Sequence, residues 1–335
     1  MTKISKKLLK RIGYIFLVLL ILIGVAGFIG IRKFNNSFFK EKPNYLEYTS
    51  ESKPIHFDWA GDSIGGIYEA HAAMIIPIKI EGLSHRFYTQ LDTGSPHSFI
   101  YRNALKSLRA IGLDIKEVVK DKVRYVENLD FILGDNHIKA SMIMIYPNYG
   151  NSFDKNDTIS SIGIGTIGSD FIANRITAID FKNQKIQLFD KRPKWISSLS
   201  GFKPFDFSGR RIMLPVTLDN KNYEFLYDSG TSAFGLITIK SRFDKYTEES
   251  TKQVNYDAKS WENSIPIRSK LTDKQFNIGS ANIKLKRVSY VDMYTITQPL
   301  IIPFTRIGGW LGNQPFTQST LILDTKTEEF IVVKD

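Results

Sequence analysis

The chain contains three pairs of segments that recur in the same order. "MIIPIKIEGLSHRFYTQLDTGSPHSFI", beginning at Met74, matches "IMLPVTLDNKNYEFLYDSGTSAFGLI", beginning at Ile212. "FILGDNHIKASMIMI" matches "FNIGSANIKLKRVSY", and "TIGSDFIANRITAIDFKNQKIQLFD" matches "WLGNQPFTQSTLILDTKTEEFIVVK". The offsets between equivalent positions are 136, 145 and 144 residues, which indicates a tandem duplication. Each copy consists of short alternating or apolar runs broken by Gly, Asn and Asp, which predicts a mostly β fold.

Both copies carry an aspartate, a hydroxyl residue, a glycine and a second hydroxyl residue after an apolar run. Residues 92–95 read Asp-Thr-Gly-Ser, and residues 228–231 read Asp-Ser-Gly-Thr. One such segment alone would indicate only a tight turn, because Asp bonds its own backbone and Gly turns freely. A pseudo-twofold axis between the copies could bring the two turns face to face, and this would place two carboxylates together.

The paired motifs resemble those of pepsin-type aspartic proteases, the single-chain, two-lobed relatives of the retroviral proteases. The resemblance covers about residues 56–335 and implies an N-terminal lobe over 56–198 and a C-terminal lobe over 199–335. In that family a later apolar-apolar-Gly segment braces each Asp turn. The matching residues are Ile167, Gly168, Leu311 and Gly312.

Carried over position by position, the resemblance makes Asp92 and Asp228 the catalytic dyad. It implies three supporting pairs: Thr93 and Ser229 bonding across the lobe interface, Gly94 and Gly230 allowing close backbone approach, and Ser95 and Thr231 donating hydroxyl bonds to the outer carboxylate oxygens.

Two adjacent carboxyls can perform acid and base catalysis together. Like charges at hydrogen-bonding distance cannot both ionise at neutral pH, so such a pair holds one proton. The ionised member takes a proton from a water that attacks the peptide carbonyl, and the protonated member gives its proton to the carbonyl oxygen. This predicts an aspartic-type endopeptidase that needs no cofactor and no metal. The sequence has no His-Glu-x-x-His and no cysteine.

The sequence departs from the family pattern mainly at the flap, the hairpin that closes over substrate. Gln90 and Pro96 are unusual but tolerable. The segment available for the flap, residues 115–131, is short and has no glycine at a turn, with Tyr125 as the nearest candidate tyrosine. In the second copy Trp261 could cover the cleft instead, or pack in the lobe core. The weak flap keeps an alternative open: a non-catalytic, pepsin-like peptide-binding module of the cell envelope.

Two further patterns predict no ligand site. "GIGTIG", residues 163–168, satisfies the dinucleotide fingerprint but lies inside a bracing segment, and its second copy lacks the spacing. The histidines are scattered without metal-ligand spacing.

The N-terminal residues predict a membrane anchor. Residues 12–31 contain no charge, and as a helix they would span about 30 Å. Five basic residues precede this run, which predicts a cytoplasmic stub over 1–11, a transmembrane signal anchor over 12–31, a juxtamembrane stalk over 32–55 and an extracytoplasmic (periplasmic or cell-surface) protease region. A cleaved signal peptide is the competing interpretation, and a pro-segment within residues 34–72 stays open.

The charge distribution argues against nucleic acid as a partner. The net charge is +11, but seven basic residues and no acidic ones lie within residues 1–33, which leaves 38 basic against 34 acidic residues elsewhere. The expected partners are therefore a peptide or protein substrate and a membrane. One chain suffices for the dyad.

Overall fold

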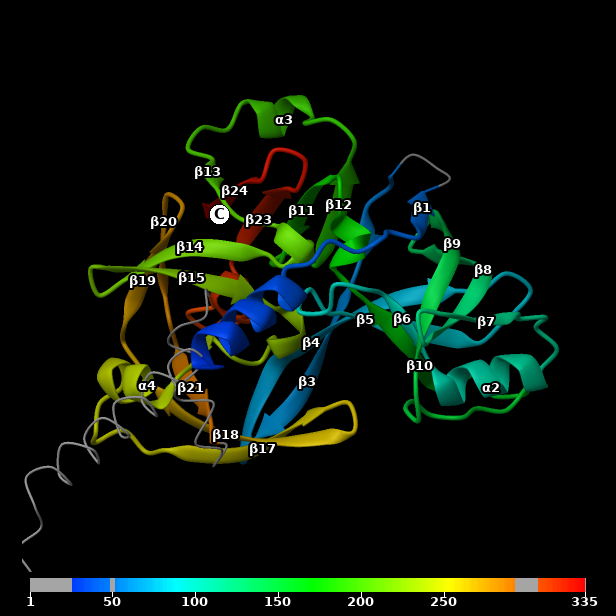
Figure 1. Ribbon diagram of the computed structural model, residues 1–335, viewed down its shortest axis with the longest axis horizontal. Coiled ribbons are helices and arrows are strands. Elements are labelled where there is room, and N and C mark those ends of the chain that lie inside the picture. The colour runs from blue at the N-terminus through cyan, green and yellow to red at the C-terminus, as the bar shows by residue number, and fades with distance from the viewer. Residues whose placement is uncertain (1–25, 49–51, 293–306, 335) are drawn as a thin grey trace, which may run out of the picture.

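The computed structural model describes residues 26–48, 52–292 and 307–334. These residues form three β-sheets with a few short helices between them, and Figure 1 shows one sheet at the right, one at the left and one above and between them. The mostly β, duplicated organisation is the predicted one.

The first-copy sheet contains nine strands in the described chain, in the order β1-β9-β6-β10-β5-β4-β8-β7, with β3 paired to β4. The strands are β1 (Leu46–Tyr48), β3 (Asp58–Ile64), β4 (Ile67–Lys79), β5 (Arg86–Leu91), β6 (Phe99–Tyr101), β7 (Glu117–Lys120), β8 (Val123–Leu133), β9 (Asn136–Tyr146) and β10 (Ser161–Ile167). The helix α2 (Arg102–Ala110) follows β6, and η1 (Ser169–Ile172) follows β10.

The second-copy sheet also contains nine described strands, in the order β17-β18-β21-β16-β22-β15-β14-β19-β20. They are β14 (Met213–Leu218), β15 (Lys221–Tyr227), β16 (Leu236–Thr238), β17 (Val254–Ser260), β18 (Asn263–Leu271), β19 (Gln275–Ile278), β20 (Ala281–Lys284), β21 (Arg287–Val291) and β22 (Trp310–Leu311). The short helices here are η2 (Ser208–Arg210), η3 (Ser229–Thr231), α4 (Lys240–Tyr246) and η5 (Gln314–Phe316).

Both copies contribute a hairpin to the third sheet, which we call the shared sheet. Its order is β13-β24-β23-β11-β12-β2, with β2 (Ile55–His56), β11 (Ile176–Asp180), β12 (Lys185–Phe189), β13 (Lys203–Pro204), β23 (Ser319–Asp324) and β24 (Glu329–Lys334); α3 (Lys194–Ser197) follows β12. The central strands β11 and β23 are antiparallel, and Ile176 pairs with Asp324 while Asp180 pairs with Thr320. This reciprocal register places the pseudo-twofold axis between equivalent strands of the two copies.

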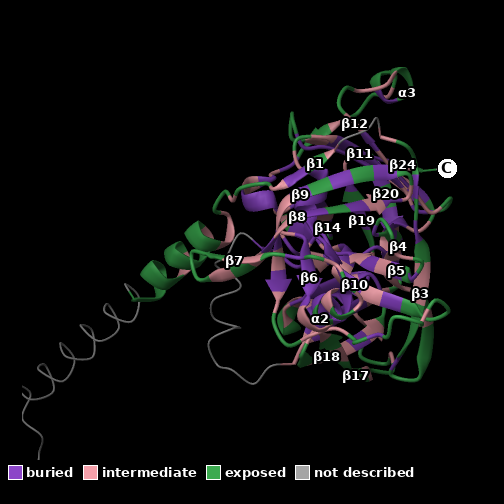
Figure 2. Cartoon of the chain, turned by 90° about the vertical axis from the view of Figure 1, so that its right-hand side faces the viewer, coloured by how far each residue is buried: buried purple, intermediate pink, exposed green. Residues whose placement is uncertain are grey.

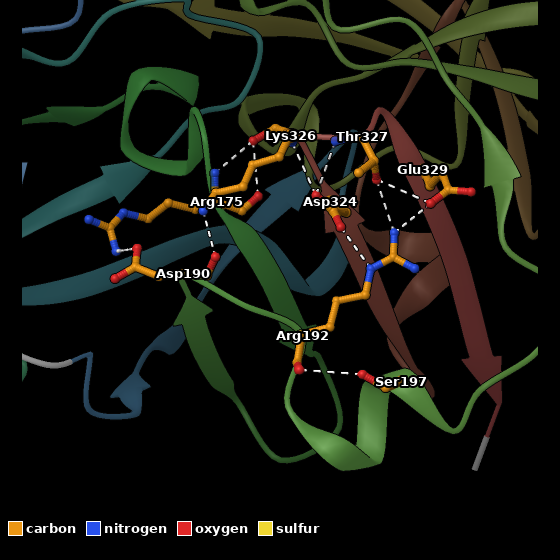
Figure 3. A network of polar contacts seen from close by, with 9 residues as sticks. Arg175, Asp190, Arg192, Ser197, Asp324, Lys326, Thr327 and Glu329 are labelled. Atoms are coloured by element: carbon orange, nitrogen blue, oxygen red, sulfur yellow. Dashed lines mark hydrogen bonds and ion pairs between the residues drawn. The ribbon is translucent and has the colours of Figure 1, made fainter.

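A polar network connects the segment that follows β12 to strands β23 and β24 of the shared sheet (Figure 3). Arg192 Nε donates to Asp324 Oδ2 at 2.7 Å, and its Nη2 donates to Glu329 Oε2 at 2.6 Å. Asp324 is only 2% exposed, so Arg192 supplies the charge partner of a buried carboxylate.

Apolar side chains from all three sheets form one continuous core. It includes residues of the first-copy sheet such as Leu91, of the second-copy sheet such as Tyr227, and of the shared sheet such as Leu321. In Figure 2 the buried residues lie along the strands within the molecule, whereas the N-terminal helical segment is mostly exposed and lies outside the sheets.

The predicted fold class also included a transmembrane helix over 12–31, and this part requires correction. In the described part of the chain, no helix is both long enough and apolar enough to cross a membrane. Residues 12–25 lie outside the described residues, and residues 26–31 belong to a helical segment that continues to residue 38. That segment loses its apolar character after residue 31, where charged and amide side chains begin. The extracytoplasmic location stays a prediction.

The segment predicted as a stalk contributes to two sheets. Residues 46–48 form β1, which pairs with β9, and residues 55–56 form β2, which pairs with β12.

Candidate functional site

Equivalent strands position the two aspartates. Asp92 follows the last residue of β5, and Asp228 follows the last residue of β15. Next to each strand lies a parallel strand that ends in a bracing segment. The N–H of Asp92 donates to the carbonyl of Ile167 at 2.9 Å, and the N–H of Asp228 donates to that of Leu311 at 2.9 Å. Each aspartate is therefore fixed where a strand ends, because its backbone completes a parallel ladder.

The glycines of the bracing segments allow the chain to pass closely behind the Asp turns. A Cβ on Gly168 would lie 2.5 Å from the carbonyl carbon of His97 and 2.8 Å from Ser95 O. A Cβ on Gly312 would lie 2.2 Å from Thr231 O and 2.3 Å from Phe234 O. Real Cβ atoms do not approach backbone so closely, so only glycine fits at these two positions.

Thr93 and Ser229 join the two turns by reciprocal hydrogen bonds. The N–H of Thr93 donates to Ser229 Oγ, and the N–H of Ser229 donates to Thr93 Oγ1, each at 2.9 Å. Thr93 Oγ1 donates to Tyr227 O at 3.1 Å, and Ser229 Oγ donates to Leu91 O at 2.8 Å. Both side chains are fully buried, so these four bonds lock the turns together within the core.

Gly94 and Gly230 each lie directly against the aspartate of the other copy. A Cβ on Gly94 would lie 2.5 Å from Cγ of Asp228, and a Cβ on Gly230 would lie 2.6 Å from Cγ of Asp92. This close approach allows the two carboxyl groups to form a hydrogen bond with each other.

Backbone N–H groups also bind the carboxylates. The N–H of Ser95 donates to Asp92 Oδ1 at 3.2 Å, and that of Gly230 donates to Asp228 Oδ1 at 2.9 Å. Burial raises the pKa of Asp92, against the opposing effect of its hydrogen bonds. Burial, together with the neighbouring Asp92 charge, raises the pKa of Asp228 well above its usual value. The pair therefore retains a proton at a pH where isolated carboxyls would both be ionised.

The hydroxyl groups of Ser95 and Thr231 do not make the bonds that the resemblance implied. Ser95 Oγ donates to the carbonyl of His97 at 2.6 Å, and Thr231 Oγ1 donates to the carbonyl of Asp228 at 2.9 Å. In turns this tight, a backbone carbonyl lies within reach of each hydroxyl, and the backbone N–H groups solvate the carboxylates instead.

Asp92 and Asp228 line a cavity of about 670 Å³ between the first-copy and second-copy sheets. Its walls are largely apolar, with Phe234, Ile237 and Trp310 on the side of the second copy. A largely apolar cavity with a few convergent polar groups is typical of a substrate site.

A hairpin of the second copy covers this cavity. Strands β17 and β18 contribute lining residues, and Trp261 lies in the turn between them. Its ring stacks on Tyr146 with centroids 5.4 Å apart and contacts Phe99 at 5.7 Å, both in the first copy. Near the other end of the hairpin, Tyr256 Oη donates to Asp62 Oδ2 at 2.9 Å. We call residues 254–271 the cover hairpin.

Tyr125, the other flap candidate, lies away from the cavity. It belongs to β8, and its ring packs edge-on against Tyr45 with centroids 6.0 Å apart. The β7–β8 hairpin that carries Tyr125 therefore does not cover the cavity, whereas the cover hairpin does.

The remaining sequence motifs form no second site. "GIGTIG" lies in and just after β10, so it lacks the loop-to-helix context that phosphate binding needs. Within residues 26–48, 52–292 and 307–334, no cluster of three His, Cys, Asp or Glu side chains could hold a metal ion.

Sequence reasoning missed two charged residues near the dyad. Asp170 is buried and accepts bonds from the hydroxyl and N–H of Ser98, both at 2.7 Å, while Ser98 Oγ accepts from the N–H of Gly168. Arg211 donates to the main-chain carbonyl of Gly94. Arg211 could have been noticed, because it directly precedes the repeated segment that begins at Ile212, whereas the small, uncharged Ala73 precedes the equivalent segment that begins at Met74.

No family model and no curated protein matches the chain. Among solved structures, the chain is similar to an aspartic proteinase from Irpex lacteus, with 11% sequence identity and a TM-score of 0.44. That match covers 84% of this chain and 97% of the other.

Proposed function

We propose that this protein is an aspartic endopeptidase that hydrolyses peptide bonds with a water activated between Asp92 and Asp228. One observation carries the proposal: two carboxyls, one buried and one partly buried, are supplied by equivalent turns of a duplicated chain and bond to each other at the wall of a large cavity. A purely structural role would not explain why both carboxyls are directed at a cavity, where they bring electrostatic cost without filling space.

In this mechanism the pair begins the reaction with one proton. The ionised carboxylate removes a proton from the water as its oxygen attacks the scissile carbonyl carbon, and the protonated carboxyl gives its proton to the carbonyl oxygen. The resulting tetrahedral diol collapses when the protonated carboxyl gives its proton to the amide nitrogen, a carboxylate of the pair takes a proton from one diol hydroxyl, and the C–N bond breaks to give an acid and an amine. The pair ends with one proton, so it is ready for another turnover.

The reciprocal bonds of Thr93 and Ser229 prevent the two carboxyls from moving apart as the charge moves between them. A fixed arrangement of this kind needs little reorganisation during the reaction, which is the main advantage of a preorganised polar site.

The size and lining of the cavity suit part of a polypeptide. Walls from both copies and the cover hairpin would enclose the residues next to the scissile bond, and the apolar lining favours apolar side chains.

The test is incubation of the purified chain with a mixed peptide library, with and without a statine-type inhibitor, across acidic to neutral pH. We expect cleavage within the library peptides, suppressed by the inhibitor and absent in Asp92→Asn. Saturable peptide binding with no cleavage at any pH would support the peptide-binding module instead.

A further inference from the structure

Arg211 contacts the first Asp turn directly, and its neighbour Ile212 bonds to the residue that precedes the second Asp turn. Its guanidinium donates through Nη1 to the carbonyl of Gly94, the glycine that lies against the Asp228 carboxyl. The adjacent residue, Ile212, accepts a 2.8 Å hydrogen bond from the N–H of Tyr227, which immediately precedes Asp228. A shift of Arg211 would therefore move the backbone of both turns.

The guanidinium brings a positive charge close to the pair. Arg211 Nε is buried and has no hydrogen-bond partner in the described part of the chain, so solvent does not screen it fully. Although burial dominates and raises the pKa of both carboxyls, Arg211 is among the groups that lower the pKa of Asp92 and of Asp228. Conversely, burial lowers the pKa of Arg211, and the two aspartates oppose that change.

The segment before β1 holds Arg211 in place. The guanidinium carbon lies 4.1 Å from the centre of the Phe38 ring, a cation–π contact. Phe38 and Phe39 pack on a small apolar cluster of Met213, Leu226 and Ile307.

The same segment also contacts Gly209 and Arg210, the two residues before Arg211. Gly209 has a φ of +59°, and a Cβ there would lie 2.8 Å from the Cα of Phe39. Its N–H donates to Glu41 Oε1 at 2.9 Å, and Arg210 donates to the carbonyl of Lys42. We call residues 38–42 the strap. The described residues that line the cavity all lie between Ala60 and Trp310, so the strap contacts the site from outside the cavity.

We propose that Arg211 is a positioning residue of the dyad, that its charge favours the ionised form of the carboxyl pair, and that Phe38 of the strap fixes the guanidinium for this task. This inference rests on the proposed peptidase function. It implies that the strap belongs to the active unit rather than to a removable leader.

Other charged groups lie near Arg211, and the test must distinguish their effects on the dyad from the effect of Arg211. Arg210 donates to Pro96 O at 3.0 Å and lies near Asp170, Glu41 and Tyr45. Lys42 lies close to both arginines, and burial with Arg211 and Arg210 lowers its pKa.

His97 is the remaining titratable neighbour. Burial, followed by the charges of Lys42, Arg210 and Arg211, lowers the pKa of His97 to about 4. His97 is therefore neutral over most of the pH range of the test.

The test compares Arg211→Met, Arg211→Lys and the matched control Arg210→Met, which removes the same charge one residue away. For each full-length variant we would measure kcat/KM against pH, and we would titrate the aspartate carboxyls by ¹³C NMR. Asp92→Asn and Asp228→Asn assign the carboxyl signals. The NMR titration does not require activity, so a wild type that fails to cleave would refute the proposed function without hiding the effect of Arg211.

Loss of the Arg211 charge should move both limbs of the pH profile, and both titration steps of the pair, to higher pH. On the acid side the rate falls as the pKa of the pair rises, so we expect a severalfold loss there in Arg211→Met and a smaller change near the pH optimum. Arg211→Lys should restore the limbs, because it keeps the charge. Arg210→Met removes a neighbouring charge and one strap contact but keeps Arg211, so it should move the limbs much less than Arg211→Met does. Limbs and titration steps that stay fixed in Arg211→Met would overturn the proposal, as would equal displacement in the lysine variant.

Phe38→Leu tests the strap separately, because leucine keeps the apolar contact and removes only the ring. It should move the limbs in the same direction as Arg211→Met, by a smaller amount. A wild-type profile in Phe38→Leu would refute the role of the strap.

Discussion

Gly94→Ala should damage catalysis far more than stability. The new Cβ would lie 2.5 Å from Cγ and Oδ1 of Asp228, whereas ordinary contacts of this kind begin at about 3.4 Å. The Asp228 carboxyl must therefore retreat by about 0.9 Å or rotate, and either movement breaks its hydrogen bond with Asp92. Displacing a reacting group by about 1 Å typically costs about 100-fold in rate, so we expect a loss of that order in kcat.

The stability cost of Gly94→Ala should be modest, at about 1–3 kcal/mol, because the clash is with the end of a side chain that can rotate. Peptide cleavage kinetics and thermal melting, measured together, check both parts. Gly30→Ala is the control, because a Cβ there would meet nothing within 4 Å. A Gly94→Ala variant that keeps kcat within a few-fold of wild type would show that the close approach of the turns is not needed.

Two further predictions concern the surroundings of the dyad. Trp261→Ala removes the ring that joins the cover hairpin to the first copy, and with it two aromatic contacts each worth about 0.5–1.5 kcal/mol. The KM for peptide should therefore rise about tenfold while kcat changes little. An unchanged KM would exclude the hairpin as a substrate cover. Arg192→Met leaves the buried Asp324 carboxylate without its charge partner, so chemical denaturation should show a loss of about 2–3 kcal/mol in unfolding free energy; a cost below about 0.5 kcal/mol would mean that the network of Figure 3 is not stabilising.

The internal repeat made much of the fold predictable, because equivalent sequences form equivalent strands. The matches that begin at Met74 and Ile212 correspond to β4–β5 and β14–β15, each ending at an Asp turn. The third match corresponds to the two hairpins that pair across the axis through β11 and β23. Motif and periodicity are local properties, and these elements depend mainly on local sequence.

The contacts that the sequence did not reveal join distant residues. Trp261 was one of two candidates for covering the cleft, but no pattern in either segment indicates that it meets Phe99 across 162 positions. The hydroxyl of Ser95 could be expected to act as a donor, but its acceptor depends on backbone carbonyls that only the folded turn brings close. The apolar run over 12–31 predicted an anchor from composition alone, whereas no helix in the described part of the chain is long and apolar enough to cross a membrane.

The shared proton is the centre of this account, and it is tested most directly by comparing Asp92→Asn, Asp228→Asn and the double variant. If the two carboxyls act as one unit, each single change should abolish peptide cleavage nearly as completely as the double change does. Thermal melting should be unchanged or improved in the single variants, because an amide relieves the repulsion between two adjacent carboxyls. Loss of cleavage with intact melting in all three is the predicted result; substantial cleavage in both single variants would contradict a dyad mechanism.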